Sequence, residues 1–314
     1  MNREAGKFMY NGIMNVYKEA GFTSHDVVAK LRGICKQKKI GHTGTLDPEA
    51  VGVLPVCFGS GTKLCGMLTD WDKEYIATLR LGVVTDTQDL TGQVLFYAGE
   101  ETLLALTEDK VRECLAGFIG AYEQIPPMYS ALKVDGKKLY ELARAGKEVE
   151  RKSRTVQIRE LEILEMSLPT VRFRVVCSKG TYIRTLCHDI GEKLGCGGAM
   201  ASLTRSRVGI FGIEEALRLS EIEKLRDESS ISNVIIPPDA VFGACREVKV
   251  TAQARRLLEN GNKIPAGMLG DCGALRDGER LRMYDETGRF YGIYGYHAGV
   301  KEVRPVRMFL TEEK

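Results

Sequence analysis

The sequence GHTGTLDP, residues 41–48, places one carboxylate, that of Asp47, on a glycine-bounded turn directly after a strongly basic segment. Residues 27–46 contain no acidic side chain and five basic ones, namely Lys30, Arg32, Lys36, Lys38 and Lys39. Lysine and arginine side chains contact phosphates, which suits an anionic polymer. Gly41 and Gly44 let the backbone turn sharply and approach a ligand closely. This stretch therefore predicts a place where an anionic polymer meets a reactive acid.

A second interpretation of Asp47 is a plain helix start. The sequence DPEA, residues 47–50, would place Asp47 at the N-cap and Pro48 at the first helical position. Just upstream, residues 12–17 are typical of a strand. They are followed by a helix capped at Thr23 or Ser24, with Asp26 completing a capping box.

The whole chain has the composition of a globular protein with a large core. It has 314 residues, of which 44% are hydrophobic, and no window approaches 18 consecutive apolar residues. The N-terminus lacks the pattern of a secretory signal, so we expect a cytoplasmic protein that does not contact a membrane. Nine scattered cysteines without a Cys-x-x-Cys pair, and four dispersed histidines, favour neither a disulfide framework nor a metal site.

Strand and helix patterns alternate irregularly along residues 1–245. Strand patterns fall at 52–58, 75–83, 155–164 and 171–178, and helical patterns at 109–116, 140–145, 182–194 and 220–226. Without a regular βαβ repeat, they predict an α+β domain, with a mixed, largely antiparallel central sheet flanked by helices. Residues 246–314 carry short strand-like runs broken by glycines, which predicts a small C-terminal β-barrel.

The longer run GHTGTLDPEAVGVLPVCFGSGTK, residues 41–63, resembles the signature of the bacterial tRNA pseudouridine-55 synthases, the TruB family. Four further segments resemble that family in the same order: KEY at 73–75, GVVTDTQD at 82–89, SKGTYIR at 178–184 and LTR at 203–205. The sequence LLENGNKI, residues 257–264, resembles the opening of RNA-binding PUA domains, a shorter match. The resemblance implies a pseudouridine synthase fold followed by a PUA-like domain.

The same resemblance implies isomerisation of the uridine at position 55 of tRNA to pseudouridine. The partner would be the T-arm stem-loop of tRNA, from which the target base must be flipped out. Breaking and remaking a bond to C1′ needs no redox cofactor and no metal, so we expect none. Nothing in the sequence demands an oligomer, and we expect a monomer.

Three residues are the expected catalytic set. Asp47 would act as base or nucleophile, and Arg184 would keep it ionised by pairing with it. Tyr75 would stack on the target base; considered alone, it is an ordinary strand tyrosine.

Six further residues are expected at the RNA substrate. His42 would fill the space that the flipped base leaves, unless it is a surface residue. Leu203 would pack against the base, although a leucine is ordinarily core, and Asp89 would either cap a turn or contact the pocket. The other matching positions are Lys18, Tyr182 and Arg205.

Residues 124–152 resemble the insertion with which the family closes over RNA. Residues 128–159 hold nine basic and four acidic side chains, an excess that suits a phosphate surface, although a solvated helix face has the same composition. The chain departs from the family pattern at Glu19, where proline is usual, and at Gly61, where alanine is common.

Three alternatives remain. One is a guide-RNA-dependent relative with the same catalytic core. Another is an RNA-binding or RNA-folding protein in which catalysis is incidental. The third is a small-molecule enzyme or a nucleotide-phosphate binder, disfavoured because GSGTK at 59–63 lacks the spacing of a P-loop.

Overall fold

A computed structural model describes residues 9–134 and 136–309. Parts of both predicted domains therefore lie outside the described residues, at 1–8 and at 310–314. The same holds for Asp135, one of the four acidic residues counted in the insertion region.

One nine-stranded sheet forms the centre of the larger domain. Seven strands follow the order β1 (Gly12–Lys18), β3 (Val51–Phe58), β12 (Gly198–Val208), β4 (Lys73–Leu81), β11 (Thr170–Cys177), β10 (Arg154–Ser167) and β7 (Gly120–Gln124), while β2 (Ile40–His42) pairs with β3 and β13 (Phe211–Gly212) with β12. Of these pairings, β3 with β12 is parallel and the rest are antiparallel. The predicted mixed, largely antiparallel sheet is confirmed.

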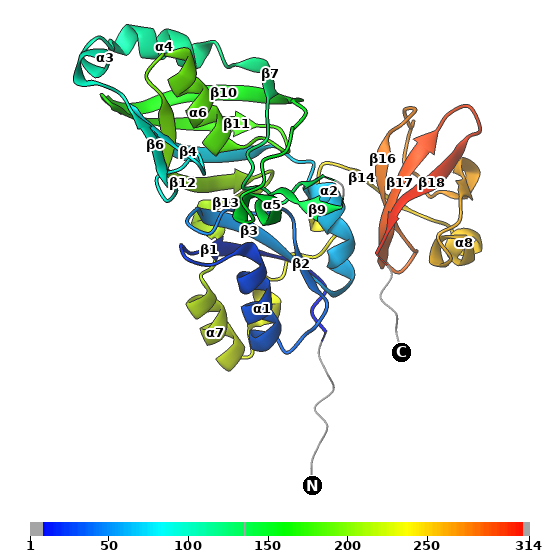
Figure 1. Ribbon diagram of the computed structural model, residues 1–314. Helices are drawn as coiled ribbons and strands as arrows, with labels where there is room; N and C mark the ends of the chain where they lie inside the picture. The colour runs from blue at the N-terminus through cyan, green and yellow to red at the C-terminus, as the bar shows by residue number, and fades with distance from the viewer. Residues whose placement is uncertain (1–8, 135, 310–314) are drawn as a thin grey trace.

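Helices cover the two ends of this sheet separately (Figure 1). Apolar residues of α1 (Ser24–Ile34) and α7 (Leu219–Asp227) share one buried cluster with β1 and β3. Those of α4 (Glu108–Ala116) and α6 (Ile183–Lys193) share another with β4, β10 and β11. The functional loops leave the sheet between these two clusters, where β3, β12 and β4 adjoin.

Local sequence chemistry explains how α1 begins. Thr23 is the N-cap, and its hydroxyl accepts from the Asp26 backbone while the Asp26 carboxylate accepts from the Thr23 backbone. The predicted capping box is therefore confirmed. By contrast, residues 47–50 form a turn without a helix, in which the Ala50 N–H donates to the Asp47 carbonyl at 3.1 Å. The helix-start interpretation of Asp47 is wrong.

A second, five-stranded sheet follows residue 245 (Figure 1). Its order is β14 (Arg246–Lys249), β16 (Arg280–Tyr284), β17 (Phe290–His297), β18 (Glu302–Met308) and β15 (Ile264–Pro265). In the sequence, α8 (Arg255–Glu259) lies between β14 and β15. It docks on the larger domain through Phe309, whose ring lies 6.4 Å from that of Phe242, and through the Tyr284 hydroxyl, which donates to Asp239 at 2.9 Å. The chain thus forms a small C-terminal β-module where a barrel is predicted, and the path of this sheet ends at β14 and β15.

The remaining elements are short. The insertion consists of β8 (Lys133–Val134), β9 (Lys137–Lys138) and α5 (Leu139–Arg144); the others are α2 (Cys65–Leu68), α3 (Glu100–Leu104), β5 (Val83–Thr85) and β6 (Val94–Tyr97). Short 3-10 helices span Gly59–Leu64, Ile213–Glu215, Ile231–Val234, Ala240–Phe242, Ala252–Ala254 and Ala266–Met268. In Figure 1 the insertion lies beside the end of the sheet that carries β2 and β3.

Candidate active site

Asp47 and Arg184 form a two-pronged ion pair. The Arg184 Nε donates to Asp47 Oδ2 at 2.8 Å, and its Nη2 donates to Oδ1 at 3.0 Å. The arginine side chain is 5% exposed, whereas that of the aspartate is 36% exposed. Parallel charge-assisted hydrogen bonds fix the carboxylate in direction as well as in charge. The carboxylate is therefore held from beneath by a buried cation and stays open on its other side.

Two backbone carbonyls and a second carboxylate complete the surroundings of Arg184. Its Nη1 donates to the carbonyl of Thr87 at 2.9 Å, and its Nη2 also donates to that of Tyr129 at 2.8 Å. Its Nε lies 3.8 Å from the Asp89 carboxylate. Since these contacts come from the loop after β5 and from the start of the insertion, Arg184 joins three segments distant in sequence.

Lys18 supports the loop that carries Asp47. It has no exposed surface, and its ammonium donates to the carbonyls of Glu19, Pro48 and Ala50 at 3.1, 2.7 and 2.6 Å. Burial lowers its pKa to about 8, although the nearby Glu49 and Asp47 carboxylates act in the opposite direction. In this structure Lys18 therefore holds the turn under Asp47 and does not reach the surface.

Arg205 lies beneath the same loop on β12 and is 1% exposed. Its Nε donates to the carbonyl of Val53 at 2.7 Å, and its Nη2 reaches that of Gly44 at 3.4 Å. Gly52 of β3 pairs with Arg205 of β12, and a Cβ atom on Gly52 would lie 2.3 Å from the Arg205 carbonyl oxygen. The glycine allows this close approach, and the arginine is placed to support the loop.

Tyr75 and Leu203 lie in the buried cluster that adjoins Asp47. Tyr75 lies on β4, opposite Arg205, and Leu203 lies on β12, opposite Ala77. The two are 8% and 7% exposed. Burial raises the pKa of the Tyr75 phenol, with Arg205 acting against that shift. Tyr75 is therefore a neutral phenol at pH 7, and it presents an apolar ring with one hydroxyl.

His42 ends β2 and is half-buried. Its Nδ1 accepts from the Gly44 N–H at 3.3 Å, and its ring packs edge to face on that of His25, with centroids 5.7 Å apart. Burial and the His25 charge lower its pKa. A neutral ring with Nδ1 as acceptor carries its proton on Nε2.

Asp89 closes the turn that it was expected to cap. Its Oδ1 accepts from the Thr87 hydroxyl at 2.8 Å and from the backbone and the hydroxyl of Thr91 at 3.0 and 2.5 Å. Its other oxygen faces Arg184. Asp89 thus combines the turn role with a place in the Asp47–Arg184 cluster.

Tyr182 is the N-cap of α6, two residues before Arg184. It is half-buried, and the Arg154 guanidinium lies 5.9 Å from its ring centroid. Its backbone pairs with the side chain of Gln124, which is fully buried.

The structure thus brings Asp47, Tyr75, Arg184, Leu203 and Asp89 together, with Lys18 and Arg205 beneath them and His42 and Tyr182 at the edges.

Sequence reasoning missed several residues that build the site. Gln124 and Ser24 have side chains that bond distant backbone, and the Ser24 hydroxyl accepts from the Leu46 N–H at 2.9 Å. The carbonyls of Thr87 and Tyr129 could not be identified either, because every residue has a carbonyl. Tyr129 lies within residues 124–152, so the sequence indicated its region but not its role.

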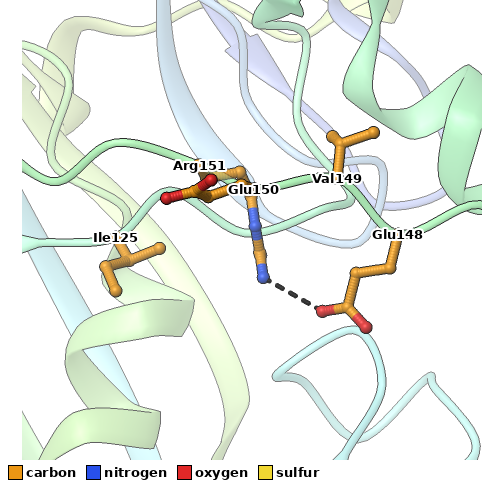
Figure 2. Close-up of a pocket in the computed structure, with 5 residues that line it drawn as sticks. All are labelled: Ile125, Glu148, Val149, Glu150 and Arg151. Carbon is orange, nitrogen blue, oxygen red and sulfur yellow. Dashed lines mark hydrogen bonds and ion pairs between the residues drawn. The ribbon is translucent and has the colours of Figure 1, made fainter.

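The basic segment before the motif is open to solvent. Lys30, Arg32, Lys36, Lys38 and Lys39 are all exposed, as phosphate contact requires. A separate open depression of about 340 Å³ lies at the end of the insertion, lined by Ile125 and residues 148–151 (Figure 2). There Arg151 pairs with Glu148 at 3.3 Å. This depression contains none of the predicted site residues.

Residues 9–134 and 136–309 contain no group of three or more His, Cys, Asp or Glu side chains that could hold a metal ion. Among the same residues, no helix has the length and apolar character needed to cross a membrane.

Two sequence profiles and curated relatives match this chain. A sequence profile described as "TruB family pseudouridylate synthase (N terminal domain)" matches residues 32–183, and one described as "tRNA pseudouridylate synthase B C-terminal domain" matches residues 184–242. A curated relative from Lachnoclostridium phytofermentans, named tRNA pseudouridine synthase B, is 51% identical over 310 residues, which cover 96% of this chain and all of that protein. A Clostridium tetani relative of the same name is 44% identical and covers 90% of this chain and 94% of that protein.

Solved structures show the same fold. A chain of a Cbf5-Nop10-Gar1 complex superposes with a TM-score of 0.73 at 25% identity, covering 97% of this chain and 86% of that one. A chain of an H/ACA RNP bound to a substrate RNA superposes with a TM-score of 0.71 at 23% identity, covering 96% and 86%. On the strength of the sequence relatives, this chain belongs to the TruB family of pseudouridylate synthases.

Proposed function

We propose that this protein isomerises the uridine at position 55, in the T-loop of tRNA, to pseudouridine. The observation that supports this proposal best is the half-open Asp47 carboxylate, which buried Arg184 holds in a fixed direction beside Tyr75. The curated relatives named tRNA pseudouridine synthase B supply the substrate class.

The reaction rearranges one bond and needs no net oxidation. The bond from C1′ of ribose to N1 of uracil breaks, the base turns, and a bond forms from C1′ to C5. The proton on C5 is lost to solvent, and N1 gains a proton. Because atoms and electrons balance within the nucleotide and water, neither a redox cofactor nor a metal is required.

In this proposal Asp47 starts the rearrangement. Arg184 stabilises the ionised form, so the carboxylate is available as base or nucleophile at neutral pH. Attack at C1′, attack at C6 and removal of a ribose proton all require the carboxylate in nearly the same place. As a neutral phenol, Tyr75 would stack on the base. Its hydroxyl would help to remove the C5 proton only by passing its own proton to another acceptor.

Access to the base requires flipping it out of the T-loop stack. His42 stands at the edge of the site with a neutral ring, which suits insertion into the vacated stack, and Leu203 would pack on the flipped base. The exposed basic segment and the insertion at 124–152 would contact phosphates. The module after residue 245 would add a PUA-like RNA contact. The protein would act in the cytoplasm as a monomer, where tRNA is available.

We also propose that the protein helps tRNA to refold. An enzyme that opens the T-loop to extract a base could also help misfolded tRNA refold, and this needs binding without the Asp47 carboxylate. The guide-RNA-dependent alternative would share the catalytic core, and one structural neighbour is a chain of an H/ACA RNP bound to a substrate RNA. Against it stand the relatives named for tRNA, which are matched over 90% or more of their length.

The test is tritium release from tRNA labelled at C5 of uridine, with purified protein and no guide RNA, followed by mapping of the modified position. We expect release by the wild type at the T-loop uridine and none by Asp47→Asn. Asp70→Asn is the matched control, because Asp70 is an exposed aspartate paired only with exposed Lys179. Equal release from wild type and Asp47→Asn would refute the assignment of Asp47. No release from either, with tRNA bound, would favour the RNA-folding alternative.

A further inference from the structure

Gln124, the last residue of β7, makes a two-way contact with the start of α6. The Tyr182 N–H donates to Gln124 Oε1 at 2.8 Å, and Gln124 Nε2 donates to the Tyr182 carbonyl at 3.0 Å. The same carbonyl accepts the first helical hydrogen bond of α6, from Leu186 at 3.0 Å. The amide oxygen accepts and the amide nitrogen donates, so the side-chain amide fits in one orientation only. The pair therefore fixes both the position and the direction of the first turn of α6.

That turn carries Arg184, whose side chain is held from the same stretch of chain. Five residues after Gln124, the Tyr129 carbonyl accepts from Arg184 Nη2. Residues 124–129 thus hold the backbone two residues before the arginine, at Tyr182, and the guanidinium of the arginine itself. Farther along α6, the Tyr122 hydroxyl of β7 donates to the Asp189 carboxylate, which adds a third tie between the two elements. Parallel hydrogen bonds to a carboxylate lose alignment with small displacements, and catalytic rates fall steeply with misplacement.

We infer that Gln124 is a positioning residue, which sets the guanidinium of Arg184 against Asp47 through its contact with the Tyr182 backbone. Gln124 has no exposed surface, so it does not itself touch RNA. The inference rests on the proposed function, because it concerns the same ion pair and the same reaction.

A glutamate at this position separates positioning from simple core filling. A neutral carboxyl group has one O–H to donate and one oxygen to accept, so it reproduces both contacts of the glutamine. An ionised carboxylate can only accept, and it would face the Tyr182 carbonyl without a donor. Full burial raises the pKa of such a carboxyl, which brings its ionisation toward the assay range. Activity of Gln124→Glu should therefore depend on pH in a way that the wild type does not.

The experiment measures single-turnover rates and tRNA dissociation constants between pH 6 and pH 8 for wild type, Gln124→Glu and Gln124→Ala. Gln157→Ala is the control, from the adjacent strand β10, where Gln157 pairs with Ala121 of β7. We expect Gln124→Ala to lose about tenfold to a hundredfold in rate, with tRNA affinity within about twofold of the wild type. Gln124→Glu should approach the wild-type rate at pH 6 and fall below it as pH rises.

Three outcomes would overturn the inference: a Gln124→Ala rate equal to the wild type, a loss confined to tRNA affinity, or a Gln124→Glu profile parallel to the wild type. Thermal unfolding at each pH shows whether a variant is folded during the assay, and a rate loss that follows the unfolded fraction also counts against positioning. An inactive wild type would instead contradict the proposed function.

Discussion

Replacing Asp47 with alanine removes the main counter-ion of a buried guanidinium. The variant loses two charge-assisted hydrogen bonds, at 2.8 and 3.0 Å, while Arg184 keeps the carbonyls of Thr87 and Tyr129. Removing one partner of a buried pair costs about 3–5 kcal/mol. Asp47 is 36% exposed and Asp89 remains 3.8 Å from Arg184, so both features reduce that cost. We expect the free energy of unfolding to fall by about 2 kcal/mol, together with complete loss of isomerisation.

Urea unfolding measures this change through Trp71, the single tryptophan, whose ring stacks on Phe211. Asp89→Asn should then be made in both backgrounds. Once Asp47 is gone, Asp89 is the remaining acidic partner of Arg184, so its loss should cost about 1 kcal/mol more than in the wild type. Unchanged or increased stability of Asp47→Ala would refute the reasoning, and so would additive effects of the two substitutions.

Three further predictions concern the loop and its surroundings. The folded pKa of His42 is lowered, so below pH 6.5 the unfolded chain binds more protons and stability falls with acidity; urea unfolding from pH 7 to pH 5 should show a smaller loss for His42→Gln than for wild type. Lys18→Met leaves the Pro48 carbonyl without its ammonium donor, so single-turnover kinetics should show a rate at least about tenfold lower with tRNA affinity nearly unchanged. Arg218→Ala breaks only an exposed contact with Glu19 and a stack 4.5 Å above the Tyr17 ring, so a melting curve should show a loss below about 1 kcal/mol.

Local chemistry made part of the fold predictable. The capping box of Thr23 and Asp26 needs only neighbours three residues apart, and the predicted strands at 12–17 and 171–178 agree with β1 and β11 within a residue at each end. The sequence of residues 41–48 was also informative, for a different reason. Their resemblance to one family is long and ungapped, whereas Gly41 lies in β2 and neither Gly41 nor Gly44 has a positive φ, so the turn does not depend on a conformation that only glycine adopts.

Strand β12 shows what local pattern could not reveal. It lies between β3 and β4, yet its sequence GAMASLTRSRV begins with small residues and ends with two arginines. Buried Arg205 is tolerated there because the carbonyls of Val53 and Gly44, distant in sequence, accept its hydrogen bonds. No residue nearby in the sequence indicates those acceptors. The pattern of this charged central strand therefore predicts a surface segment.

Glu19 shows how a departure from a family pattern can be accommodated. In place of the usual proline, its carboxylate pairs with Arg218 at 2.9 Å, and its carbonyl accepts from Lys18 at 3.1 Å. The loop beside the site is thus held by an ion pair and a buried ammonium where a proline ring would have stiffened it. These two contacts therefore hold the loop at the position where the chain departs from the family pattern.

Three cations are buried around the loop that carries Asp47. Lys18, Arg184 and Arg205 are all buried near this loop, and each donates to backbone carbonyls, whereas Asp47 and Asp89 are the carboxylates that face Arg184. Carbonyl oxygens carry only partial charge, while Glu49 and Asp26 add negative charge near Lys18. Buried cations close to a half-exposed opening would attract a phosphate backbone to it. A cation buried for stability alone would be better replaced by an apolar side chain. We therefore expect the three buried cations to serve the proposed reaction as well as the fold.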